Sequence, residues 1–491
     1  MTSNFDLRPL FEPRSVAVIG ATDAINKIGN NVISNLIFSG FKGEIFPVNP
    51  NLQKVYDIKA YPKITDIPQE VDLAVIVIPA KQVPQVFKEC VEKGVKAVII
   101  ITAGFSEAGE EGKKMQEEIA TIARENKIAV VGPNCMGIVN MTCNLNTLMT
   151  RNIPTRGNIS MVSQSGTVGL VLMGAMAEKG GGISKFVSSG NEAVLRLDDF
   201  LEYFTYDEDT KVVAAFIEGV RNGERFLRVT KELTRRKPFI VIKAGRTGAG
   251  SHAARSHTSS ITGSTQIFNA VAKQNNIITC ESTEDLIDYA VAFSIGILPQ
   301  GKRVGIITPG GGWGVLAADA CEEYGLEVPK LPKDIVDKIS EKAPPYWSHG
   351  NPVDLVATYN LELLTWCGEV LLESEAFDSL MIQFFAGNLS TMIKSWKNTG
   401  KVDEQYVEGM AQRWKQFMHN IAVDTAKLVE KYKKPVFCIT RDPEFTEMLV
   451  SRNIPAYVDP RRAAKCLIKM LEYKEHLEKK EKGNQALMAL K

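Results

Sequence analysis

The chain has 491 residues, of which 44% are apolar and 23% are charged, and its formal net charge is +1. A chain of this length is expected to form about three domains, and its near-neutral charge excludes bulk attraction to nucleic acid or to an anionic membrane. The first residues lack the basic start and apolar core of a signal peptide, and no apolar run is long enough to cross a bilayer, so we expect a cytoplasmic protein without a membrane span.

Short β-branched runs that end in small residues alternate with longer amphipathic stretches, which is the pattern of parallel α/β sheets. Runs of this kind recur in three sets, and they are 15–22, 72–79 and 97–104, then 158–166, 212–219 and 238–245, and finally 303–311, 378–385 and 435–441. We therefore predict the α/β fold class, with three doubly wound parallel-sheet domains of Rossmann-like and flavodoxin-like type. The predicted domains are 1–140, 150–295 and 300–460, and they are followed by a helix or linker at 461–491.

The second and third domains are expected to be the most alike. Ser163-Gln-Ser-Gly166 and Thr308-Pro-Gly-Gly311 align at a separation of 145 positions, and each follows an apolar run. In doubly wound sheets, ligands bind at the carboxyl ends of the strands. We therefore expect the functional residues where these runs end.

In the first domain, the turn Gly20–Gly29 places small residues and backbone N–H groups at a helix start, which suits a diphosphate. The turn does not read G-x-G-x-x-G, and Phe46-Pro-Val-Asn-Pro50 stands where a dinucleotide-binding fold carries an acidic residue for the ribose. This departure disfavours a nicotinamide dinucleotide and favours another nucleotide-like ligand. A tight strand-to-helix turn without a ligand explains the pattern equally well.

In the second domain, Ser163–Gly166 supplies hydroxyl groups and a glycine at a predicted helix start, where the helix dipole stabilises an anion. Capping residues of this kind also occur without a ligand. Glu218 ends an otherwise apolar strand, and a buried carboxylate needs a partner. That partner is either a histidine N–H or a salt bridge to Lys243 or Arg246.

Two further turns are candidates for binding small anions. Ser188-Ser-Gly-Asn-Glu192 has backbone and amide donors that suit a small carboxylate, although the same composition is common in ordinary loops. Gly310-Gly-Gly-Trp-Gly314 offers a phosphate cradle in the third domain, but it follows no Walker pattern and has no adjacent lysine.

A polar loop from Lys243 to Ser264 follows the apolar run Phe239–Ile242, and it is rich in glycine, serine and threonine. His257 has little apolar surface to pack against in such a loop. Because a neutral imidazole is a nucleophile, His257 is a candidate to accept a phosphoryl group and pass it on. A solvated loop histidine without a chemical role is the alternative.

Thiol and metal chemistry have little support in the sequence. The eight cysteines are dispersed, with no C-x-x-C pair and no histidine at ligand spacing, so we expect reduced thiols and no metal site. Cys135 lies in a predicted strand-end turn, where it is placed to lie near a thiol ligand without being a nucleophile.

These motifs together resemble the NDP-forming acyl-CoA synthetases, a family that includes ADP-forming acetate–CoA ligase, succinyl-CoA synthetase and ATP-citrate lyase. The resemblance covers nearly the whole chain, and its nine motifs in order are Pro13–Ala21, Phe46–Pro50, Gly132–Gly137, Ser163–Gly166, Ser188–Glu192, Phe216–Gly219, Lys243–Arg246, Ser256–Ser260 and Thr308–Gly312. Each motif alone is weakly specific, whereas nine in sequence are highly specific.

The resemblance implies that His257 is phosphorylated during turnover and that Glu218 is the carboxylate that supports it. It also implies that the first domain binds coenzyme A, and the expected contacts are Gly20, Ala21, Thr22, Asp23, Lys27, Pro47, Asn49, Pro79, Thr102, Ala103, Asn134 and Cys135. Phosphate and substrate are expected at Ser163, Gln164, Ser165, Gly166, Ser189, Gly190, Asn191, Gly310 and Gly311.

The implied reaction converts an acyl-CoA, phosphate and ADP into a carboxylic acid, CoA and ATP through an acyl phosphate and a phosphohistidine, and it is reversible. The family carries an ATP-grasp domain on a separate β subunit or on the same chain, and no such domain follows residue 460. We therefore expect a partner subunit or fused domain to hold Mg-ATP or Mg-ADP, in an assembly such as α2β2. Ser259 stands where the family loop usually has glycine.

The alternative is a CoA-binding regulatory or acyltransferase scaffold of the same fold without ligase activity. Retention of both His257 and Glu218 argues against it. The sequence leaves the identity of the small carboxylic acid open.

Overall fold

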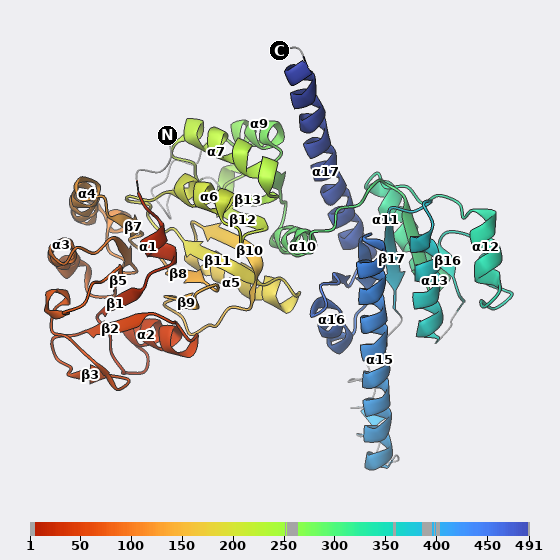
Figure 1. The fold of residues 1–491 in the computed structure, drawn as a ribbon, viewed down its shortest axis with the longest axis horizontal. Coiled ribbons are helices and arrows are strands. Elements are labelled where there is room, and N and C mark those ends of the chain that lie inside the picture. The colour runs from red at the N-terminus through yellow and green to blue at the C-terminus, as the bar shows by residue number, and fades with distance from the viewer. Residues whose placement is uncertain are drawn as a thin grey trace. The chain divides into compact units, whose positions relative to one another are not determined.

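The computed structural model describes residues 5–250, 252, 264–356, 360–384, 395–396, 398 and 403–489. They form two compact units, the first made of 1–177 with 182–286 and the second of 178–181 with 287–491. Three sheets built mainly of parallel strands carry the fold, and a long helix, α17 (Pro460–Ala489), ends the chain (Figure 1). The predicted α/β class, with its parallel sheets and C-terminal helix, is confirmed.

The first sheet has the strand order β2-β1-β5-β6-β7 and is parallel throughout. Its strands are β1 (Ser15–Ile19), β2 (Glu44–Val48), β5 (Leu73–Ile76), β6 (Ala97–Ile100) and β7 (Ala129–Val131). The accompanying elements are α1 (Arg8–Phe11), α2 (Ile28–Phe38), α3 (Val83–Glu92), α4 (Glu110–Glu125), the 3-10 turns η1 (Ile64–Asp66), η2 (Ala80–Gln82) and η3 (Ser106–Ala108), and the hairpin β3 (Lys54–Val55) and β4 (Ile58–Lys59).

Helices on both faces explain why strand β1 is apolar from Val16 to Ile19. Val16 and Val18 pack with α1 and α2, whereas Ala17 and Ile19 pack with α3 and α4. A strand that is buried on both faces cannot alternate polar and apolar residues. The β-branched runs that were predicted as strands are therefore the interior of a doubly wound sheet.

The second sheet has the order β14-β13-β12-β10-β11-β8-β9. Its strands are β8 (Ile138–Asn140), β9 (Leu145–Asn146), β10 (Arg156–Ser163), β11 (Ile183–Ser188), β12 (Val212–Ile217), β13 (Phe239–Lys243) and β14 (Ile278–Thr279). Its helices are α5 (Gly166–Glu178), α6 (Leu197–Tyr206), α7 (Gly223–Arg236), α9 (Thr265–Asn275) and α10 (Thr283–Ser294). Strand β8 pairs antiparallel with β11, so the segment at the predicted end of the first domain belongs to the second sheet.

The third sheet, in the second unit, has the order β16-β15-β17-β18-β19. Its strands are β15 (Val304–Thr308), β16 (Val353–Asp354), β17 (Ser379–Gln383), β18 (Val436–Ile439) and β19 (Ala456–Tyr457). Its helices, besides α17, are α11 (Gly311–Glu323), α12 (Lys333–Ser340), α13 (Leu361–Glu373), α15 (Glu404–Tyr432) and α16 (Pro443–Val450).

The second and third sheets share a strand-to-helix turn as well as their topology. The Ser163 hydroxyl donates to the Ser165 carbonyl, 2.6 Å away, and the Thr308 hydroxyl donates to the Gly310 carbonyl, 2.9 Å away. In both sheets the first long strand lies between the second and the third, so its end is the point where the winding reverses. A ligand site is expected at such a point.

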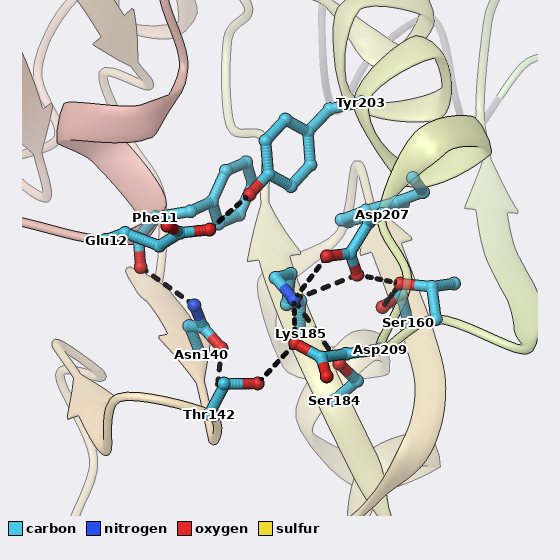
Figure 2. A network of polar contacts seen from close by, with 12 residues as sticks. Phe11, Glu12, Asn140, Thr142, Ser160, Ser184, Lys185, Tyr203, Asp207 and Asp209 are labelled. Atoms are coloured by element: carbon cyan, nitrogen blue, oxygen red, sulfur yellow. Dashed lines mark hydrogen bonds and ion pairs between the residues drawn. The ribbon is translucent and has the colours of Figure 1, made fainter.

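A polar network links α1 to strands β8 and β11 of the second sheet within the first unit (Figure 2). The Phe11 carbonyl accepts a hydrogen bond from Asn140, and the Phe11 ring stacks on Tyr203 with centroids 4.4 Å apart. Lys185, 1% exposed, lies 2.8 Å from both carboxylate oxygens of Asp207 (Figure 2). One apolar cluster also contains residues of both sheets, which explains why the first two sheets form a single unit.

Gly29 allows helix α2 to pack directly against the end of β1. A Cβ atom at this position would lie 2.0 Å from the carbonyl oxygen of Gly20, which is a backbone atom and cannot rotate away. We predict that Gly29→Ala lowers the free energy of unfolding by about 1–3 kcal/mol, the usual cost of overpacking. Urea denaturation followed by circular dichroism measures this change.

Gly174→Ala is the matched control, since Gly174 is also helical but a Cβ there has nothing within 4 Å. This control is expected to keep or raise the stability, because alanine favours a helix. Equal losses in both variants would contradict the packing argument.

Candidate active site

A cavity of about 880 Å³ lies in the first unit, where strands of the first and second sheets end. Strand β6 ends before Thr102 and β7 before Asn134, whereas β10 ends before Gln164 and β12 before Glu218. The lining residues are Ile28, Ile101, Thr102, Ala103, Glu107, Asn134, Cys135, Met136, Met149, Gln164, Ser165, Gly166, Thr167, Gly190, Asn191, Glu192, Glu218, Gly219, Val220 and Arg221. The cavity thus brings predicted CoA, phosphate and catalytic residues to one place.

The side chain of Gln164 connects the ends of three neighbouring strands. Its Oε1 accepts hydrogen bonds from the backbone N–H groups of Glu218, at 2.6 Å, and Gly219, at 3.0 Å. Its Nε2 donates to the Gly219 carbonyl at 2.9 Å and to Glu192 Oε1 at 3.0 Å. Gln164 therefore holds the Glu218 segment with its amide, and both hydrogens of its side-chain NH2 group are used within the protein.

Glu218 is 7% exposed and borders the cavity. The Lys243 ammonium donates to the Glu218 backbone carbonyl, at 2.7 Å, and to the Ala244 carbonyl, at 2.6 Å. Arg246 donates instead to the carbonyls of Cys280 and Glu281. Neither of the two predicted cations makes an ion pair with the Glu218 carboxylate. Burial lowers the pKa of Lys243, and the charge of Glu218 opposes this change.

The start of helix α5 forms one wall of the cavity through Ser165, Gly166 and Thr167. The first N–H groups of a helix have no partner within the helix, and they carry its positive end. Ser163 is fully buried and donates its hydroxyl to the Ser165 carbonyl, so the hydroxyl is not available to a ligand. Of the predicted phosphate motif, Ser165 and Gly166 are the residues placed to meet an anion.

The turn after strand β11 contributes Gly190 and Asn191 to the lining. Gly190 has a φ of 61°, and a Cβ there would lie 2.4 Å from the Pro133 carbonyl oxygen. Asn191 donates to Glu107 Oε2 at 2.5 Å and accepts from Asn134 at 3.3 Å. Ser189 is buried and gives its hydroxyl to Glu192 at 3.0 Å, so it supports the turn rather than facing a substrate.

The predicted CoA residues of the first sheet lie mostly in the loops after β1 and β2. Asn49 donates to the Ala21 carbonyl at 2.9 Å, and the Thr22 hydroxyl accepts from the backbone of Ala24 at 3.1 Å. Asp23, Lys27 and Pro79 are exposed, and Gly20 ends β1 with a φ of 93°. Pro47 is buried inside strand β2, opposite Val18, so its side chain has no surface to offer a ligand.

The other predicted CoA contacts line the cavity itself. Thr102 gives its hydroxyl to the Ile78 carbonyl at 2.7 Å, and Ala103 and Asn134 are exposed beside it. Cys135 is 4% exposed, and burial raises the pKa of its thiol to about 12. A thiol with a raised pKa stays protonated at neutral pH and is a poor nucleophile. All eight cysteines of the chain are free.

Gly310 and Gly311 belong to the second unit, at the start of helix α11. A Cβ at Gly311 would lie 2.8 Å from a carboxylate oxygen of Asp354. An acidic side chain therefore lies beside this helix start. The turn repeats the geometry of the Ser163 turn, and its predicted contact with phosphate stays a prediction.

His257 lies outside the residues that the structure describes, so its predicted role is not tested by the contacts above. Within the described ranges there is no group of three or more His, Cys, Asp or Glu side chains placed to hold a metal ion. In the same part of the chain, none of the helices has the length and apolar run needed to span a bilayer.

Several lining residues were not predicted, and Glu192 is the most unusual of them. It is 3% exposed, its φ is 54°, and its Oε2 lies 3.9 Å from Arg221 Nε. Burial raises the pKa of the Glu192 carboxyl, while hydrogen bonds from Gln164 and Ser189 and the charge of Arg221 oppose this shift. The sequence placed Glu192 in a turn, but only the folded chain shows that the carboxyl points inward.

Three family models match successive parts of the chain. A CoA binding domain covers residues 14–141, a succinyl-CoA ligase like flavodoxin domain covers 156–293, and a ligase-CoA domain covers 304–394. The first two matches coincide with the two sheets whose strand ends surround the cavity.

Similar proteins and solved structures give the same result. The chain is 40% identical over 387 residues to the alpha subunit of an ADP-forming acetate–CoA ligase II from Pyrococcus furiosus, which covers 78% of this chain and 84% of that subunit. It is 39% identical over 352 residues to an ADP-forming 4-hydroxybutyrate–CoA ligase from Nitrosopumilus maritimus, covering 71% of this chain and 50% of that protein. A dinucleotide-forming acetyl-coenzyme A synthetase 1 from Ca. Korarchaeum cryptofilum, solved with phosphate and ADP, matches with a TM-score of 0.83 at 31% identity, covering 96% of this chain and 98% of that one. The chain belongs to the NDP-forming acyl-CoA synthetase family, as its motifs predicted.

Proposed function

We propose that this chain is the CoA- and acyl-binding part of an ADP-forming acid–thiol ligase. Acyl-CoA, phosphate and ADP are converted into the carboxylic acid, CoA and ATP, and the phosphoryl group passes through His257. The observation that best supports this proposal is the hydrogen bond from the Glu218 backbone N–H to the Gln164 side chain, beside the start of helix α5. It places an acid and a helix N-terminus in one cavity with strand ends of the CoA-binding domain.

Coenzyme A fits the edge of the first sheet. The loop after β1 stays close to α2 because Gly29 contacts the Gly20 carbonyl, which leaves backbone N–H groups at the helix start for a diphosphate. A thioester carried by the same molecule would reach the cavity beside Thr102, Ala103 and Asn134. These residues bind and orient; Cys135, protonated and buried, takes no part in thiol exchange.

The chain's own groups support phosphoryl transfer by position and charge. The positive end of α5 stabilises the phosphate that attacks the thioester carbonyl and the acyl phosphate that results. Glu218 receives a ring N–H of His257, so that the other ring nitrogen attacks phosphorus and the carboxylic acid leaves. Because phosphoryl transfer needs little covalent help beyond the nucleophile, correct placement accounts for most of the rate.

The nucleotide step is proposed to occur on a partner. One relative of this chain is named an alpha subunit, and the chain spans half the length of another relative. Both facts support an ATP-grasp subunit or fused domain that binds Mg-ADP, in an assembly such as α2β2. The acid is a small carboxylic acid, since relatives are named for acetate and for 4-hydroxybutyrate.

The proposal is tested by mixing the chain with its ATP-grasp partner and γ-labelled ATP. A label that is stable in base and labile in acid is expected on this chain, and addition of CoA and the acid should discharge it. ATP formation from acyl-CoA, phosphate and ADP measures the forward direction. A chain that binds CoA but never takes up label is instead a CoA-binding scaffold without ligase activity.

Glu218→Gln is predicted to slow phosphohistidine formation by about 100- to 1,000-fold, because the neutral amide no longer stabilises the charged ring. The dissociation constant of CoA should not change. Rapid-quench labelling gives the rate, and calorimetry gives the affinity. Glu224→Gln, which alters an exposed acid at the start of α7, is the control and should label at the normal rate. An unchanged rate in Glu218→Gln would remove this residue from the mechanism.

A further inference from the structure

The three strand ends around Gln164 form a continuous chain of contacts from Glu192 to Glu218. Strand β10 lies between β11 and β12, so the residue after β10 faces loops from both neighbours. Gln164 uses this position to contact Glu192 after β11 and Glu218 after β12. We propose that Glu192 is a positioning residue, which sets the orientation of the Gln164 amide and through it the position of the Glu218 carboxylate. This inference rests on the proposed function.

The first step is the orientation of the amide. Both hydrogens of Gln164 Nε2 are used, one by Glu192 Oε1 and one by the Gly219 carbonyl, and Oε1 receives two backbone N–H groups. Glu192 Oε1 accepts hydrogen bonds from both Gln164 Nε2 and the Ser189 hydroxyl, so Glu192 requires the NH2 group of Gln164 on its own side. A rotated amide would place its oxygen against this carboxylate and its NH2 group against the Glu218 and Gly219 N–H groups.

The second step is the link from the amide to the catalytic carboxylate. The backbone of Glu218 is held on both sides, since its N–H donates to Gln164 and its carbonyl accepts from Lys243. With both peptide groups held, the Cα–Cβ bond of Glu218 has a fixed direction, and the carboxylate extends from that fixed point. Glu192 touches no part of Glu218 in the contacts described, so its effect passes through the amide.

The third step concerns the unfavourable free energy of placing Glu192 in a buried site with a positive φ. A carboxyl that is 3% exposed loses its hydration, and a φ of 54° is unfavourable for a residue other than glycine. The nearest cation contact in the described structure is the 3.9 Å approach of Arg221. Costs of this kind concentrate at functional sites, where precise placement compensates for them.

The experiment is a double-mutant cycle of Glu192→Ala and Glu218→Gln, with the rate of His257 phosphorylation as the readout. Glu192→Ala alone is expected to slow this rate roughly 100-fold, the effect of a small misplacement, and to leave CoA affinity unchanged. In the Glu218→Gln background, the same substitution should change the rate by less than about twofold, because the carboxylate it positions is already gone. Losses that multiply in the double variant would overturn the proposal.

If Glu192→Ala does not fold, exchanging the residue types at positions 164 and 192 provides a second test. Gln164→Glu places two carboxylates against each other and should be slow. Gln164→Glu combined with Glu192→Gln restores one donor and one acceptor between the two positions, and the rate should recover in part, because the carboxylate at 164 still lacks a donor for the Gly219 carbonyl. Glu192→Gln alone should keep most of the rate, since its amide oxygen accepts the same bonds. A double exchange as slow as Gln164→Glu would overturn the proposal.

Asp72→Asn is the matched control, because Asp72 is also a buried carboxyl but pairs with Arg14 rather than with Gln164 or Arg221. A loss of stability is expected from this change, but its effect on the rate should be the same with and without Glu218. The wild-type chain separates this inference from the proposed function. If wild type takes up no label, the function fails; if wild type labels and Glu192→Ala labels equally fast, only the role of Glu192 fails.

Discussion

The His257→Ala variant is expected to take up no phosphoryl label from ATP in the presence of the partner, a loss of more than about 10⁴-fold, because no other group replaces a missing nucleophile. CoA should bind with unchanged affinity, since the expected CoA contacts lie in the first sheet and around the cavity rather than in the loop 243–264. Formation of ATP from acyl-CoA, phosphate and ADP should disappear together with the label.

His252→Ala is the matched control for this prediction. His252 lies five positions before His257 in the same polar loop and is exposed. It should label at the normal rate, which separates loss of the nucleophile from a general change in the loop. Label that survives in His257→Ala would discard the phosphohistidine route while leaving the family membership intact.

The Lys185→Met variant is expected to lower the free energy of unfolding of the first unit by about 3–5 kcal/mol, the usual effect of removing one partner of a buried ion pair. Asp207 is 8% exposed at its side chain and would keep a buried negative charge without the ammonium that lies 2.8 Å away (Figure 2). Asp207 and Asp209 precede strand β12, whereas Glu218 follows it, so the network and the candidate site lie at opposite ends of this strand. The rate of phosphorylation per folded molecule should therefore not change.

Hydrogen exchange of strands β10–β12 is the suitable measurement for this variant. Tryptophan fluorescence is not, because all five tryptophans, at positions 313, 347, 366, 396 and 414, belong to the second unit. Lys54→Met removes an exposed ion pair with Asp57 and should cost at most about 1 kcal/mol. A similarly small loss in Lys185→Met would show that the buried network adds little to stability.

The candidate site was partly predictable from the sequence. The contrast between Gln164 and Ser165 shows which of its features were not. Both lie in a motif that marks a helix start, and both were assigned to phosphate. The helix start itself is local, and Ser165 lines the cavity as expected. The side chain of Gln164 instead makes hydrogen bonds with Glu192 and with the backbone N–H of Glu218, which lie 28 and 54 positions away. No local sequence pattern indicates these contacts.

Pro47 and strand β8 illustrate the same limit. Pro47 was expected to contact CoA, but it lies inside strand β2 and is buried in the fold. The segment 138–140 follows the last strand of the first sheet in sequence and pairs with β11 of the second. Sheet pairing is a choice among distant segments, so the sequence boundary and the structural one differ.

The amino-acid sequence by itself determined the fold class, the recurring order of strands, the equivalence of the turns at Ser163 and Thr308, and the family. These features depend on apolar periodicity and on small residues at strand ends, which act over a few neighbouring positions. Only the tertiary structure decided that Glu192 is buried with its carboxyl against Gln164, and that Lys243 holds the backbone rather than the carboxylate of Glu218. Those contacts exist because the strand order places β10 between β11 and β12, and so joins residues that are far apart along the chain.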